Sequence, residues 1–139
     1  MSDLYARVGG LDVLLAVCER WHALCLQHPV AAHPFERAMH PHHDLRLAAY
    51  LAEALGGPAL YTAGYGTESD VQRIHACNGE HVELDEACLE LFDQALIDTG
   101  VAGDAAAGIS AYFRSATEAQ RAYADPSHPV PDDLPFRQA

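Results

Sequence analysis

Apolar side chains recur at every third or fourth position along most of this chain, a spacing typical of amphipathic α-helices. Four long segments have it, at about residues 11–25, 43–55, 82–98 and 104–123. The inward-facing series of the first is Leu11, Leu14, Leu15, Cys18 and Cys25. No alternating run of β-branched residues competes with these segments, so the sequence predicts an all-α fold.

Glycines and prolines mark the ends of the predicted helices. The pair Gly9-Gly10 interrupts the chain before the first long segment, and Gly56-Gly57-Pro58 follows the second. The run Thr67-Glu68-Ser69-Asp70 has the form of a capping box, which predicts that a short helix begins there and reaches His75. Residues 31–41, with a proline near each end, predict a tight corner.

The length of 139 residues is enough for about one domain. Half of the prolines lie close to the end of the chain, at Pro126, Pro129, Pro131 and Pro135. We therefore expect one helical domain over residues 1–124 and a Pro-rich tail over residues 125–139 that is extended or disordered.

Charge and composition exclude several classes of protein. A net charge of -12, with scattered arginines and no lysine, argues against binding nucleic acid and excludes a lysine Schiff base. No apolar run approaches the roughly 20 residues of a membrane span, and the first residues lack the basic stretch of a signal peptide. We expect a soluble, cytoplasmic protein with reduced cysteines and no membrane partner. Acidic residues such as Glu68 and Asp85 are expected on a solvated face.

Nine histidines supply most of the candidate chemistry. His75 lies on the short predicted helix, just before the long segment that begins near Val82. A neutral imidazole held in this way is a good ligand for soft metals, above all heme iron. An alternative is a helical metal-binding or interaction protein that uses His33, His40, His42 and His43. A zinc site there is disfavoured because no cysteine or acidic pair is nearby, and helical spacing turns His43 inward beside Leu47.

Four motifs occur in order along residues 4–100. They are Leu4-Tyr5-Ala6-Arg7-Val8-Gly9-Gly10, Leu55-Gly56-Gly57-Pro58, Arg73-Ile74-His75 and Glu83-Leu84-Asp85-Glu86. In this order and spacing they resemble the group II truncated hemoglobins. The resemblance implies a two-over-two helical sandwich around heme b (iron protoporphyrin IX), with a short proximal helix and a flexible C-terminal tail.

The resemblance also implies roles for single residues. His75 would be the proximal ligand of the iron, and Phe35 the aromatic residue that wedges against the porphyrin. Arg46 and Arg73 match positions that pair with heme propionates in relatives, where the guanidinium can bind both carboxylate oxygens. The other expected heme contacts are His43, Leu47, Tyr50, Ile74 and Cys88.

Two positions depart from the family pattern on the distal side. His22 replaces the usual tyrosine, so His22 and His43 are expected to supply the hydrogen bonds to a bound ligand, and would be the catalytic residues of an enzyme. The alternative for His22 is a core histidine bonded to a backbone carbonyl. Cys88 replaces the usual tryptophan, so we expect a distal cavity that is larger or filled differently; the alternative for Cys88 is a small apolar filler.

The expected function is the binding of dioxygen and other diatomic ligands at heme iron, as in oxygen transport. The distal face of the iron would be open to these ligands, or closed by His43. The alternative is a heme enzyme, with either a nitric oxide dioxygenase or a peroxidase-like activity on a small-molecule substrate. A reductase would supply electrons to such an enzyme. A distal histidine can act as the general acid in such reactions.

Overall fold

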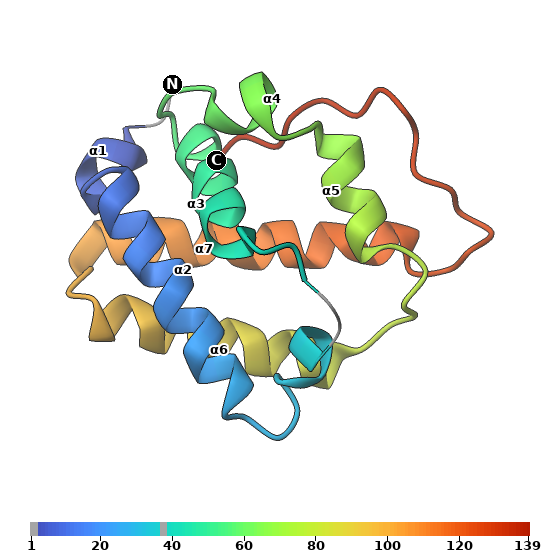
Figure 1. The fold of residues 1–139 in the computed structure, drawn as a ribbon, viewed down its shortest axis with the longest axis horizontal. Coiled ribbons are helices and arrows are strands. Elements are labelled where there is room, and N and C mark those ends of the chain that lie inside the picture. Colours follow the sequence, from blue (N-terminus) through green and yellow to red (C-terminus); the bar gives the residue numbers. More distant parts are fainter. Residues whose placement is uncertain (1–2, 37–38) are drawn as a thin grey trace.

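The computed structural model describes residues 3–36 and 39–139, and within these ranges it consists of helices and connections without a strand (Figure 1). The elements are α1 (Leu4–Val8), α2 (Leu11–Leu26), η1 (His33–Glu36), α3 (His43–Ala54), α4 (Leu60–Gly64), α5 (Glu68–His75), α6 (Val82–Asp98), α7 (Gly103–Ala119) and η2 (Gln120–Tyr123). The long helices fall where the apolar spacing predicts them. The expected corner contains the short 3₁₀-helix η1.

The long helices form two crossed layers. In Figure 1, α6 (yellow) and α7 (orange) run side by side, and α2 (blue) crosses them next to α3 (teal). The residues buried between the layers are the periodic apolar ones, such as Leu14, Val17, Leu51, Phe92 and Ile109. This is the predicted two-over-two sandwich, and it arises because each long helix buries one apolar face against the opposite layer.

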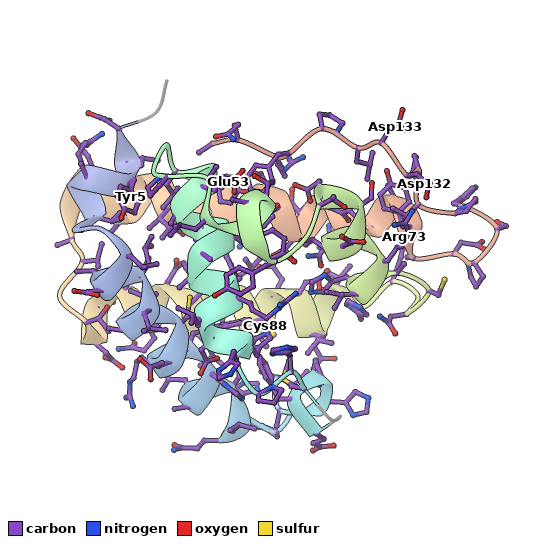
Figure 2. All side chains as sticks on the ribbon, turned by 45° about the horizontal axis from the view of Figure 1, so that its top comes forward. Tyr5, Glu53, Arg73, Cys88, Asp132 and Asp133 are labelled. Atoms are coloured by element: carbon purple, nitrogen blue, oxygen red, sulfur yellow. The ribbon has the colours of Figure 1, made fainter. Side chains whose placement is uncertain are left out.

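The two double-glycine motifs meet at one aromatic side chain, Tyr5 of α1 (labelled in Figure 2). Gly9 ends α1 with a φ of 114°, in the left-handed region that glycine adopts without strain, and the Gly10 amide donates to the Tyr5 carbonyl at 3.0 Å. A Cβ on Gly57 would lie 2.6 Å from the Tyr5 ring. Both motifs are thus needed to pack α1 against the end of α3.

Side-chain hydrogen bonds cap the first turns of α4 (Leu60–Gly64) and α5 (Glu68–His75). Glu53, near the end of α3, accepts hydrogen bonds from the Thr62 amide (2.9 Å) and hydroxyl (2.7 Å), and lies beside α4 in Figure 2. The predicted capping box at the start of α5 is present: the Thr67 hydroxyl accepts from the Asp70 amide at 3.2 Å, and Asp70 accepts from the Thr67 amide at 2.9 Å. These caps satisfy amides that a helix start leaves without partners.

The C-terminal tail runs back over α5 towards α3 (red in Figure 1). The Arg137 amide donates to the Glu68 carboxylate at 2.8 Å, and the Tyr112 hydroxyl donates to the Arg137 carbonyl at 2.8 Å. The Ala139 amide donates to the Ala54 carbonyl at 2.9 Å. The tail is largely extended, as expected, but the expected flexibility is not confirmed, because these contacts bind its last residues to the helical domain.

Candidate functional site

A cavity of about 400 Å³ lies between the two layers. Its wall residues come from helices of both layers and from η1. They include Trp21 (α2), Phe35 (η1), His43 (α3), His75 (α5), Cys88 (α6) and Phe113 (α7). A mainly apolar wall with a few polar groups is typical of a cavity that holds a small molecule or cofactor.

His75 is the last residue of α5, and its ring orientation is fixed by its own helix. The Nδ1 atom lies 2.9 Å from the carbonyl oxygen of Val71, one turn earlier. Because a carbonyl can only accept, Nδ1 carries the proton and Nε2 of the neutral ring keeps a free electron pair. Burial lowers the pKa of His75, which favours this neutral form. The surrounding protein thus desolvates the His75 ring, while the side chain keeps access to solvent through the open cavity that it lines.

A second group of polar residues surrounds the end of η1 and the start of α3. His43 lines the cavity, and its Nδ1 lies 3.3 Å from Oδ1 of Asp44. His22 of α2 is not part of the wall; its Nδ1 lies 2.9 Å from the same oxygen. Burial is the main cause of a lowered pKa of His43, and Asp44 opposes it. The two predicted distal histidines are therefore brought together by one carboxylate.

Sequence reasoning missed a charged group on the cavity wall. Asp85 of α6 is buried, against the expectation of a solvated face, and accepts from Arg121 at 3.2 Å. His81 Nδ1 lies 3.0 Å from the other oxygen of Asp85. His81 and Asp85 are four residues apart across the start of α6, a spacing that could have indicated the pair. Nothing in the sequence indicates that Arg121 joins them.

Five of the predicted heme contacts are not among the cavity-lining residues. Arg46 lies over the Tyr65 ring, 5.0 Å from its centroid, and Arg73 pairs with Asp132 of the tail (Figure 2). The other three are Leu47, which packs against the core, Tyr50, which donates to Glu68, and Ile74, which is exposed. Of the arginines that the structure describes, Arg121 is the one at the cavity.

The space next to Cys88 is filled by an indole from another helix. The Trp21 ring lies edge-on to Phe35 and Phe113, at centroid distances of 5.4 and 5.3 Å. Its Nε1 donates to the Cys88 carbonyl at 2.9 Å. A tryptophan of α2 thus lies on the cavity wall beside Cys88.

Comparison with known proteins identifies the family. A profile described as bacterial-like globin matches residues 3–119. The chain belongs to this globin family. The group II truncated hemoglobin of Bacillus anthracis matches with a TM-score of 0.75 and 21% identity, over 87% of this chain and 90% of that one. The hemoglobin of Chloroflexus aurantiacus, a thermophilic phototrophic bacterium, matches with a TM-score of 0.72 and 25% identity, over 84% and 95%. No curated protein sequence matches the chain.

The globin family implies heme binding, and it suggests a diatomic ligand. The fold implied by the resemblance to group II truncated hemoglobins is confirmed, and the family match confirms a bacterial-like globin. Among the described residues of this globin, no helix is both long enough and apolar enough to span a membrane.

Proposed function

We propose that this globin binds heme b through His75 and presents the opposite face of the iron to a diatomic ligand such as dioxygen. The observation that carries the proposal is the hydrogen bond from His75 Nδ1 to the Val71 carbonyl at 2.9 Å. Histidine ligands of metals commonly donate their second ring nitrogen to a carbonyl or carboxylate, because this fixes the tautomer and raises the basicity of the coordinating nitrogen. When bound, heme supplies an iron atom at which dioxygen, carbon monoxide or nitric oxide coordinates.

The rest of the wall fits the same cofactor. Phe35, Phe113 and Trp21 offer apolar and aromatic surface to a flat macrocycle. Heme b also carries two carboxylates, and Arg121 and His81 are the basic residues near one end of α6 that can neutralise them. The pairing of both residues with Asp85 keeps these donors in position.

His43 is the polar side chain that we assign to the ligand side. Its Nδ1 faces Asp44, so the hydrogen bond holds a proton on Nδ1 and leaves Nε2 as an acceptor. In this tautomer Nε2 of His43 could hold the iron while no diatomic ligand is bound, and such a ligand would then have to displace it. A proton moved to Nε2 would instead make His43 a donor to the ligand.

The test is the absorption spectrum of purified protein as isolated, after reduction, and with carbon monoxide. We expect a Soret band in the wild type and none in His75→Ala, because the variant no longer retains heme. His75→Gly with added free imidazole should recover the band, which distinguishes loss of a ligand from a packing defect.

His42→Ala is the matched control, since His42 directly precedes His43 in the chain but does not line the cavity. It should retain heme with the wild-type spectrum. A His75→Ala protein that keeps heme with an unchanged spectrum would show that the ligand is another residue and would overturn the proposal.

A further inference from the structure

Three side-chain atoms of metal-ligand type converge beside the cavity. They are one ring nitrogen of His22, one ring nitrogen of His43 and a carboxylate oxygen of Asp44, and all lie within 4.8 Å of one another. The group joins α2 to the first turn of α3, so residues far apart in sequence meet there. Among the described residues it is the one such group of three or more histidine, cysteine or acidic side chains.

The orientation of both imidazoles is set by the packing around them. The Phe35 ring stacks on His22 with a centroid distance of 4.8 Å and an interplanar angle of 29°. The same ring meets His43 edge-on at 5.9 Å. The two histidines and Asp44 are about a quarter exposed, with side-chain accessibilities of 25%, 28% and 27%. The group is therefore pre-organised and still reachable by a small ion.

We propose that His22, His43 and Asp44 form a binding site for a divalent first-row metal ion, separate from the iron of the heme. Two imidazoles and one carboxylate are a ligand set for zinc and for non-heme iron, and their open positions are filled by water or substrate. The site does not depend on the proposed role of His75, because none of its three ligands is on α5.

The separations between these atoms agree with such a site. Nδ1 of His22 and Nδ1 of His43 lie 2.9 and 3.3 Å from Oδ1 of Asp44. Ligands at about 2.0–2.2 Å from one zinc ion are roughly 3–3.5 Å apart. Without metal, both Nδ1 atoms donate protons to Asp44; with metal, each neutral ring carries its proton on Nε2 instead, so no net proton release is needed. The net charge of -12 favours the approach of a cation.

The neighbouring histidines lack this arrangement and supply the controls. The His40 and His42 rings are tilted by 47° with a centroid distance of 5.7 Å, but Nδ1 of His40 accepts from the His42 amide. His28 Nδ1 accepts from two backbone amides in the turn after α2. The rings of His28 and His40 bond to the backbone, and the His42 ring contacts His40, so removing the His42 ring leaves the three proposed ligands in place.

The experiment is equilibrium dialysis of the purified full-length protein against Zn²⁺, with the bound metal measured by mass spectrometry. We expect about one equivalent in the wild type and in His42→Gln. Asp44→Asn and His22→Gln should each weaken this binding about tenfold or more, since ligands and their supporting groups have effects of that size. Circular dichroism of each variant checks its helical content; if one variant does not fold, the other decides the test.

The proposal is overturned if the wild type binds no zinc, if Asp44→Asn and His22→Gln bind it as tightly as the wild type, or if His42→Gln loses it equally. The Soret band of the same samples separates this result from the proposed function. Zinc bound as expected in protein that fails to take up heme would contradict the role of His75 alone. Heme taken up without zinc would contradict the metal site alone.

Discussion

The indole of Trp21 donates a hydrogen bond to the backbone carbonyl of Cys88, at 2.9 Å, and so ties α2 to α6 at the wall of the cavity. The thiol of Cys88 is hydrogen-bonded to that of Cys25, one helical turn after Trp21, and this bond raises the pKa of Cys25. At this part of the cavity wall the two helices therefore contact one another through one ring and two small sulfur groups. A large side chain at position 88 would compete with the ring of Trp21.

Cys88→Trp should destabilise the protein by about 1–3 kcal/mol, the usual cost of overpacking a core. In the double variant with Trp21→Ala the new indole can take the space that the old one leaves. We expect the loss in the double variant to be smaller than the sum of the two single losses by about 1 kcal/mol or more, as measured by urea unfolding.

Cys88→Ala is the control for that comparison, because it keeps the backbone carbonyl that Trp21 binds. Its stability should stay closer to the wild type than that of Cys88→Trp. Strict additivity of the single losses would mean that the two indoles do not share space.

Ending the chain after Pro135 should lower the free energy of unfolding by about 1–3 kcal/mol. The truncation removes the Arg137 amide from the buried carboxylate of Glu68 and the Arg137 carbonyl from the Tyr112 hydroxyl. Buried polar groups without partners cost energy on this scale. Thermal unfolding and limited proteolysis measure the effect.

The variant Arg73→Gln tests a further tail contact, the ion pair with Asp132. Arg73 pairs with Asp132, whose side chain is 96% exposed, and exposed ion pairs contribute at most about 1 kcal/mol. We expect a change below that value. A larger loss for Arg73→Gln than for the truncation would place the main attachment of the tail at Asp132 instead of Glu68.

Stability should fall at alkaline pH, and Tyr112 should be one cause. Burial raises the pKa of Tyr112 from 10.0 to about 12. Between these values the unfolded chain loses the phenol proton and the folded protein keeps it, so stability that is present below pH 10 is lost as the pH rises towards 12. The size of this effect is on the order of 1–3 kcal/mol.

Urea unfolding at several pH values, for the wild type and Tyr112→Phe, measures that slope. The variant also loses the bond to the Arg137 carbonyl, which lowers stability at every pH, so the decisive quantity is the change in stability between pH 10.0 and about 12, the two pKa values of Tyr112. We expect a shallower decline in Tyr112→Phe. Equal slopes would assign the alkaline loss to Tyr50 and Cys18, whose pKa values are also raised by burial.

The fold was predictable because its signals are local. The spacing of apolar residues predicts α3 and α6 to within about one residue of their observed bounds, His43–Ala54 and Val82–Asp98. The capping box predicts the start of α5 at Glu68. These features depend on neighbours within one or two turns of the same helix, which a sequence displays directly.

The partners of charged residues were not predictable in the same way. Arg73 was expected at the heme but pairs with the tail, while Arg121, unnoticed in the sequence, lies at the cavity. Glu68 was expected on a solvated face and is buried, because an amide from the end of the chain reaches it. Long flexible side chains find partners across the tertiary structure, and apolar spacing carries no information about those pairings.

Helix α5 connects the cavity to the C-terminal end of the chain. Its last residue is His75 at the cavity, and its first turn holds Glu68 and Ser69, which bind Arg137 and Leu134 near the chain end. The helix has only eight residues from Glu68 to His75, so it is short enough to move as one rigid body. If His75 holds heme iron as proposed, a shift of its imidazole on ligand exchange would displace the C-terminus, and a fluorophore placed there would report the exchange from outside the cavity.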